Sequence, residues 1–184
     1  MLLTGLLPDI STDPAIETAT DSIETGRSGT IVAPVGIRPP LLAAVASRAA
    51  TPLVVLTATG RDAESLTNAL ASWIPGVAML PAWETLPHER LSPQVDTMAR
   101  RIAVLRRLVH PIEGDESAGP LSVLVVPIRA FLQPIISGLA DLEPVRVRTG
   151  DILDLTDVTN RLAELGYERV DMVEGRGQMS VRGG

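Results

Sequence analysis

Short hydrophobic runs alternate with longer amphipathic segments through the first two thirds of the chain. The hydrophobic runs are rich in Val, Ile and Leu and predict β-strands at residues 29–33, 53–58, 77–80 and 121–126. Helical patterns occupy residues 13–25, 40–50, 61–73 and 94–110. Strands that alternate with helices are typical of βαβ units, and nearly continuous apolar strands indicate that helices cover both faces of a parallel sheet. The pattern therefore predicts an α/β fold.

The clearest helical pattern is that of residues 94–110. Its hydrophobic positions recur at steps of three and four, so they form one stripe: Val95, Met98, Ile102, Leu105 and Val109. Four arginines lie off this stripe: Arg100, Arg101, Arg106 and Arg107. We interpret them as a solvated basic face near the end of a helix, in preference to a phosphate-binding surface.

The character of the sequence changes after residue 140. Residues 144–149 alternate like a half-exposed strand, and residues 154–165 predict a helix capped by Asp154 and ended by Gly166. Two further strands are expected at residues 167–174 and 178–182, on either side of a turn. We therefore expect one domain at 1–141 and the start of a small α+β domain at 142–184, truncated because its sheet stops short.

Composition narrows the possible functions. A hydrophobic fraction of 45% is enough for a folded core, which must be aliphatic because only 2% of the residues are aromatic. The net charge of −6 and the few aromatic rings argue against a general nucleic-acid binder. Cysteine is absent, and neither a membrane-length apolar run nor a basic leader is present. We expect a soluble, cytoplasmic protein that makes no membrane contact.

Motifs for catalysis or cofactor binding are missing. A phosphate loop would follow the first strand, but residues 33–40 (APVGIRPP) contain one glycine, no lysine and three prolines, which lack N–H donors. The dinucleotide fingerprint and the nucleophile elbow are also absent. His88 is interpreted as a structural residue held by a neighbouring carboxylate, and Trp83 as a packing anchor. We expect no catalytic residue, no cofactor and no metal in this chain.

Two long motifs resemble one bacterial family. Residues 80–93 (LPAWETLPHERLSP), followed by Asp96, Thr97 and the arginine-rich helix, closely resemble the transcription-repair coupling factors (Mfd). Residues 166–173 (GYERVDMV) and 181–184 (VRGG) resemble the same family. The resemblance extends over nearly all of the chain.

The resemblance implies a fold and a role. The N-terminal region of these proteins is similar to the excision-repair protein UvrB: a helicase-like α/β domain (UvrB domain 1a-like) followed by a small α+β domain that binds UvrA. The phosphate loop of UvrB corresponds here to residues 34–40, where it is degenerate. RNA polymerase, DNA and ATP are expected to bind only to domains outside these residues. The resemblance thus implies a non-catalytic module that recruits UvrA in transcription-coupled nucleotide excision repair and contacts the rest of its own protein.

The resemblance also implies which residues bind UvrA. UvrB-like proteins use an arginine in a Tyr-x-Arg strand and another in a Val-Arg-Gly strand, which match Arg169 and Arg182. A further family arginine corresponds to Ser180, so that contact is lost here. Arginine suits such a surface because its planar fork pairs with carboxylates through two hydrogen bonds. The alternative interpretation is that both arginines are ordinary surface charges on an exposed face of the sheet.

Two alternative functions stay open at this stage. One is a nucleic-acid-handling domain of the helicase type, which the missing phosphate-loop lysine disfavours. The other is an autoinhibitory structural module that covers binding or motor surfaces of the full-length DNA translocase.

Overall fold

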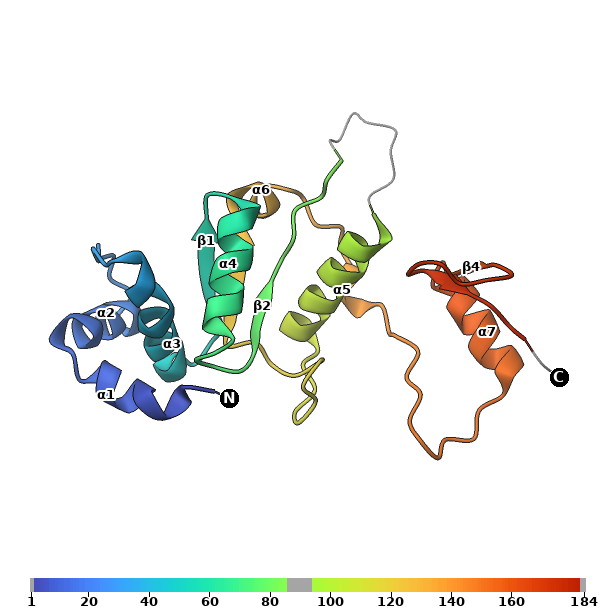
Figure 1. Cartoon of the computed structure of the whole chain (residues 1–184), viewed down its shortest axis with the longest axis horizontal. Helices are drawn as coiled ribbons and strands as arrows, with labels where there is room; N and C mark the ends of the chain where they lie inside the picture. Colours follow the sequence, from blue (N-terminus) through green and yellow to red (C-terminus); the bar gives the residue numbers. More distant parts are fainter. Residues whose placement is uncertain (1, 86–93, 183–184) are drawn as a thin grey trace.

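The computed structural model describes residues 2–85 and 94–182, and Figure 1 shows their arrangement. The helices are α1 (Leu7–Ser11), α2 (Pro14–Glu24), α3 (Arg38–Arg48), α4 (Gly60–Leu70), α5 (Val95–Val109), α6 (Ile128–Phe131) and α7 (Leu155–Glu164). The strands are β1 (Leu53–Thr57), β2 (Val77–Met79), β3 (Val123–Pro127), β4 (Glu168–Arg169) and β5 (Gln178–Met179). Short 3-10 turns are η1 (Thr4–Leu6), η2 (Val35–Ile37) and η3 (Leu139–Asp141).

A three-stranded parallel sheet forms the centre of the larger part, with the strand order β1-β3-β2. All five residues of β3 are buried, as expected for a central strand covered on both faces. Val123 and Val125 point to one face of the sheet, whereas Leu124 and Val126 belong to the core cluster on the other. The predicted strands at 53–58, 77–80 and 121–126 are confirmed.

Helix α4 packs on one face of this sheet, α3 packs against α4, and α1 and α2 pack against α3. Small side chains allow the close approach, since Ala43, Ala44 and Ala63 have no exposed surface. Leu70 is also completely buried, with Leu66 and Trp73 packed beside it. The predicted helices at 13–25, 40–50 and 61–73 are confirmed, and the aliphatic core expected from the composition is present.

The other face of the sheet is covered by α5, and only in part. Val104 of α5 belongs to a second core cluster with Leu80 and Val126. Val54 and Leu56 of β1 point to the same face but remain about half exposed, at 51% and 48%. The sheet therefore ends in an edge strand with an uncovered apolar face.

One predicted strand does not form. Residues 29–33 lie outside any sheet, with Ile31 47% exposed and Val32 95% exposed. The expectation of a buried strand was wrong because a hydrophobic β-branched run becomes a strand only where a sheet edge pairs with it. In the structure β1 pairs with β3 alone.

The solvated basic face predicted for α5 is wrong for Arg101, and it holds only in part for Arg106 and Arg107, which are half-buried and donate to the carbonyl oxygens of Leu142 and Gly119. The residues of α5 that bury are Thr97, Arg101, Val104 and Leu105, a stripe rotated by about one position from the predicted one. Arg101 has no exposed surface at all. Its Nη1 donates to the carbonyl oxygen of Pro81 at 2.6 Å, and its guanidinium lies over the Trp83 ring, 4.4 Å from the centroid. Burial lowers the pKa of the Arg101 guanidinium, since it disfavours the charged form.

Contacts on both sides fix the chain where it leaves β2. The side-chain amide of Gln133 accepts from the Trp83 N–H at 2.8 Å and donates to the Trp83 carbonyl oxygen at 3.2 Å. Thr97 donates to the Glu84 carboxylate, and Arg129 donates to the Glu84 carbonyl oxygen at 3.1 Å. These bonds hold the backbone of Trp83, whose ring contacts the Arg101 guanidinium. His88 lies outside the described residues.

The C-terminal residues form a small separate module of α7, β4 and β5. The predicted helix at 154–165 is confirmed, and Gly166 ends it with φ +86°. The predicted strand at 144–149 is wrong, because that segment has no strand partner and is almost entirely exposed. The two strands expected at 167–174 and 178–182 shrink to two residues each and pair in parallel, so the turn between them is not that of a β-hairpin.

Asp154 caps α7 and should make this helix sensitive to acid. Its Oδ1 accepts from the N–H groups of Asp157 and Thr156, and these bonds lower the pKa of the Asp154 carboxyl. A lowered pKa means that the cap stabilises α7 at neutral pH and that this stabilisation is lost as pH falls through the lowered pKa. We expect the ¹³Cα shifts of the first turn of α7 to move toward coil values in acid. In Asp154→Asn that acid transition should be absent, and an unchanged transition would contradict the prediction.

Within residues 2–85 and 94–182, no helix has the length and apolar character needed to cross a membrane.

Candidate partner-binding surface

The predicted site residues lie on the short parallel pair of the C-terminal module. Arg169 is the second residue of β4, and its backbone neighbours hold the pair together. Glu168 N–H donates to the Gly177 carbonyl oxygen at 2.8 Å, and Val170 N–H donates to the Met179 carbonyl oxygen at 2.9 Å. Arg182 lies three residues beyond the end of β5, on its continuation. Both arginines were expected on adjacent strands, and the structure places Arg169 in β4 but Arg182 outside β5, on its continuation.

Both arginines line one surface depression of about 560 Å³. The residues around it are Arg169, Val170, Asp171, Ser180, Val181 and Arg182. Two guanidinium groups against one carboxylate make its rim positive on balance. Such a rim suits a carboxylate group of a binding partner, which an arginine fork can bind through two hydrogen bonds.

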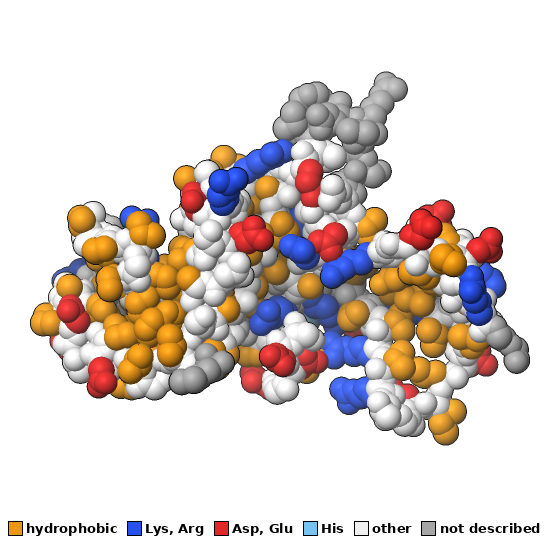
Figure 2. Space-filling view, in the orientation of Figure 1, with side chains coloured by type: hydrophobic (Ala, Val, Ile, Leu, Met, Phe, Trp, Pro, Cys, Tyr) orange, Lys and Arg blue, Asp and Glu red, His pale blue; other side chains and the backbone are white. Residues whose placement is uncertain are grey.

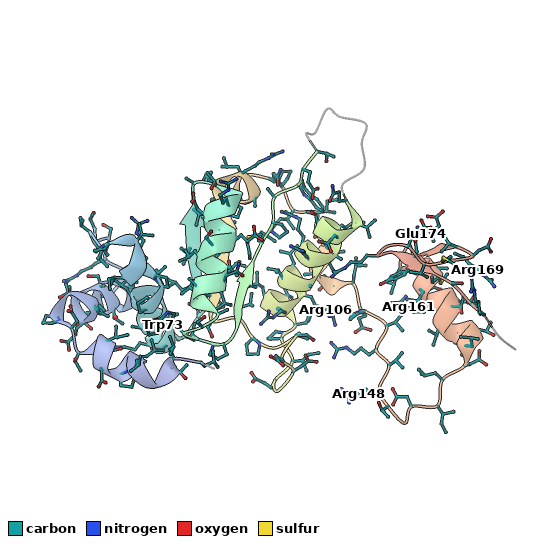
Figure 3. All side chains as sticks on the ribbon, viewed as in Figure 1. Trp73, Arg106, Arg148, Arg161, Arg169 and Glu174 are labelled. Atoms are coloured by element: carbon teal, nitrogen blue, oxygen red, sulfur yellow. The ribbon has the colours of Figure 1, made fainter. Side chains whose placement is uncertain are left out.

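The two guanidinium groups are held differently. Nη2 of Arg182 donates to the carbonyl oxygen of Asp171 at 2.8 Å, which fixes its direction. Within residues 2–85 and 94–182, the Arg169 side chain makes no hydrogen bond or ion pair, and it is exposed. Figure 3 shows Arg169 on the side of the module that faces away from α5. Arg169 is thus free to pair with a partner, while Arg182 is already oriented.

Sequence reasoning missed the residues that orient Arg182. The carbonyl oxygen of Asp171 accepts from Arg182 and also from the Ser180 hydroxyl, the latter at 3.0 Å. Ser180 therefore supports the strand pair from within the module. No sequence signal could have found this arrangement, because the accepting group is a backbone carbonyl that every residue carries.

Residues 34–40, which the resemblance matched to a degenerate phosphate loop, form no glycine-rich loop in the structure. Residues 35–37 form the turn η2, which continues directly into α3. Pro39 and Pro40 lie in the first turn of α3, so two of the N–H groups that would face a phosphate are missing. The N-cap residue Ile37 has no side chain that could accept or donate a hydrogen bond there.

Among the described residues there is no group of three or more His, Cys, Asp or Glu side chains placed to hold a metal ion. Expectations about His88 stay predictions, since this residue is not among those described.

Comparison with known proteins defines the class of the C-terminal module. A family model described as the UvrB interaction domain matches residues 145–184, which include the strand pair and both arginines. UvrABC system protein B of Vibrio parahaemolyticus is 28% identical over 154 residues, which are 77% of this chain and 22% of that protein. The C-terminal module is therefore similar to a UvrB interaction domain.

Most of the chain is similar to the transcription-repair coupling factors. The transcription-repair-coupling factor of Mycobacterium tuberculosis is 47% identical over 156 residues, covering 84% of this chain. That of Escherichia coli is 27% identical over 145 residues, covering 78% of this chain. In both cases the chain spans 12% of the length of the relative. The resemblance expected from residues 80–93 and 166–184 is confirmed.

Proposed function

We propose that this chain is a non-catalytic interaction module that recruits UvrA in transcription-coupled nucleotide excision repair. The observation that carries the proposal is the single depression lined by Arg169 and Arg182, inside the segment that matches the UvrB interaction domain. The arginine rim would meet carboxylate groups of UvrA. The division into a domain at 1–141 and a UvrA-binding domain at 142–184 is part of the proposal, supported by the change of structure after η3 and by a family match that begins at residue 145.

The larger domain is proposed to be a helicase-like domain that has lost nucleotide binding. Support comes from the parallel sheet, the similarity to UvrB, and the two prolines in the first turn of α3. In the whole protein, RNA polymerase, DNA and ATP would bind to other domains. This region would also make intramolecular contacts with those domains. We propose a cytoplasmic location, consistent with a DNA-repair role. A fluorescent ATP analogue that bound this chain saturably would favour the helicase-type alternative.

Calorimetric titration with purified UvrA tests the recruitment directly. We expect the parent chain to bind and the Arg169→Ala/Arg182→Ala double variant to lose about 2 kcal/mol of binding free energy, a factor of roughly 30, if both are hot-spot residues. Arg148→Ala/Arg161→Ala is the matched control, because it removes the same charge from residues 142–184 outside the depression (Figure 3). Its affinity should stay close to that of the parent.

Equal losses in the two double variants would mean that only total charge matters. An unchanged affinity of Arg169→Ala/Arg182→Ala in a folded protein would move the interface elsewhere. Failure of the parent chain to bind would contradict the recruitment function of these residues.

A further inference from the structure

The C-terminal module is attached to the larger domain by a segment that buries little surface. Residues 142–153 contain no helix or strand, and almost all of them are exposed, with Ile152 fully so. At the start of this segment Arg106 of α5 donates to the carbonyl oxygens of Ala140 and Leu142, at 3.5 and 3.1 Å. The fixed end of the connection therefore lies at α5, and the following residues can pivot.

A second contact joins the far end of the module to the first turn of α5. The turn between β4 and β5 brings Arg176 to Asp96, with 3.0 Å between Nη1 and Oδ1. The other oxygen of Asp96 pairs with Nε of Arg100 at 2.7 Å, so one carboxylate joins two arginines. Gly177, with φ +82°, lies so close to Val95 that an added Cβ would be 2.8 Å from its Cγ1.

An apolar groove of about 900 Å³ lies between these two points of attachment. Met98 and Ile102 of α5 line one side, and Leu162, Leu165 and Tyr167 of the module line the other. Figure 2 shows hydrophobic side chains of the module gathered on the side that faces α5. The module is thus held at the edges of the groove, without a continuous packed interface.

We propose that a latch holds the interaction module against α5. It consists of the ion pairs of Asp96 with Arg100 and Arg176 and of the close approach of Gly177 to Val95. Opening the latch lets the module pivot on residues 143–153 and exposes both walls of the groove. Exposed ion pairs contribute little each and are screened by salt, so the latch favours the closed state at low salt by a margin that added salt or the loss of one charge reduces. The depression with Arg169 and Arg182 does not include any latch residue, so the latch sets the orientation of that surface without covering it.

The natural absence of cysteine allows a direct distance measurement. Spin labels on Asn68→Cys in α4 and Asn160→Cys in α7, both exposed positions, report the distance between the larger domain and the module by double electron–electron resonance. At low salt the parent should give one narrow distance distribution. Asp96→Asn should raise the ratio of open to closed molecules roughly fivefold, the factor expected for loss of about one exposed ion-pair interaction. A similar broadening is expected in 1 M NaCl.

Asp157→Asn is the matched control, because Asp157 also carries its charge in the first turn of a helix and belongs to no ion pair among the described residues. Arg176→Gln, which alters only the module side of the latch, should broaden the distribution like Asp96→Asn. Circular dichroism of each variant confirms that it is folded. The latch is refuted by a broad distribution in the parent at low salt, by no change in both latch variants, or by equal broadening in Asp157→Asn.

Discussion

Arg101→Ala is expected to lower the free energy of unfolding by about 3 kcal/mol, the range for emptying a fully buried site. The substitution removes the guanidinium that lies over Trp83 and leaves the carbonyl oxygen of Pro81 without its donor. A buried acceptor left unpaired adds its own desolvation cost. Chemical denaturation of the parent and the variant measures the difference.

Arg100→Ala is the control on the same helix. The Arg100 side chain is 58% exposed and pairs only with Asp96 among the described residues, so its loss should cost less than about 1 kcal/mol. If the two variants were equally stable, Arg101 would not contribute to the fold in the way its burial indicates.

Arg101→Met separates packing from charge. Nε and Nη2 of Arg101 are buried without a hydrogen-bond partner among the described residues, so the native charge is only partly compensated. Methionine fills most of the same volume without a buried charge, and such replacements are often neutral or stabilising. We expect Arg101→Met to be closer in stability to the parent than to Arg101→Ala. A loss as large as that of alanine would show that the hydrogen bond to Pro81 dominates.

Gly76→Ala should also cost about 3 kcal/mol, from a left-handed backbone and a steric overlap together. Gly76 has φ +72°, and an added Cβ would lie 2.9 Å from both the Pro120 carbonyl oxygen and the Ser122 nitrogen. The Gly76 carbonyl oxygen accepts from the N–H groups of Ser122 and Val123, so this close approach joins the start of β2 to the start of β3. Thermal unfolding followed by circular dichroism measures the loss.

Gly114→Ala isolates the backbone contribution. Gly114 has φ +78°, but nothing lies within 4 Å of its added Cβ. Its substitution should cost about 1 kcal/mol, the penalty of the left-handed conformation alone. Comparable losses at the two glycines would mean that the neighbours of Gly76 move aside at little cost.

The candidate site was predictable only through the resemblance. Arg169 and Arg182 were named from motifs, and the structure places both at one depression. Their spacing in sequence could not show this, because the parallel pairing of β4 and β5 decides which residues become neighbours. The partners that orient Arg182 could not be predicted, since they depend on a backbone carbonyl brought close by that pairing.

The sequence by itself determined the local elements of this protein and its family. Helical periodicity, the Asp154 cap and the Gly166 stop depend on residues close together in the chain, so they could be read directly. The same holds for the three apolar strands of the central sheet.

Only the tertiary structure decided which surfaces meet. Helix α5 has two faces that could pack against the larger domain. The face that contains Arg101 is buried there, whereas Met98 and Ile102 line the groove. Residues 29–33 have the composition of a strand, but they pair with neither edge of the sheet. In both cases the outcome depends on contacts between distant segments, whose free energies exceed the local preferences that sequence patterns express.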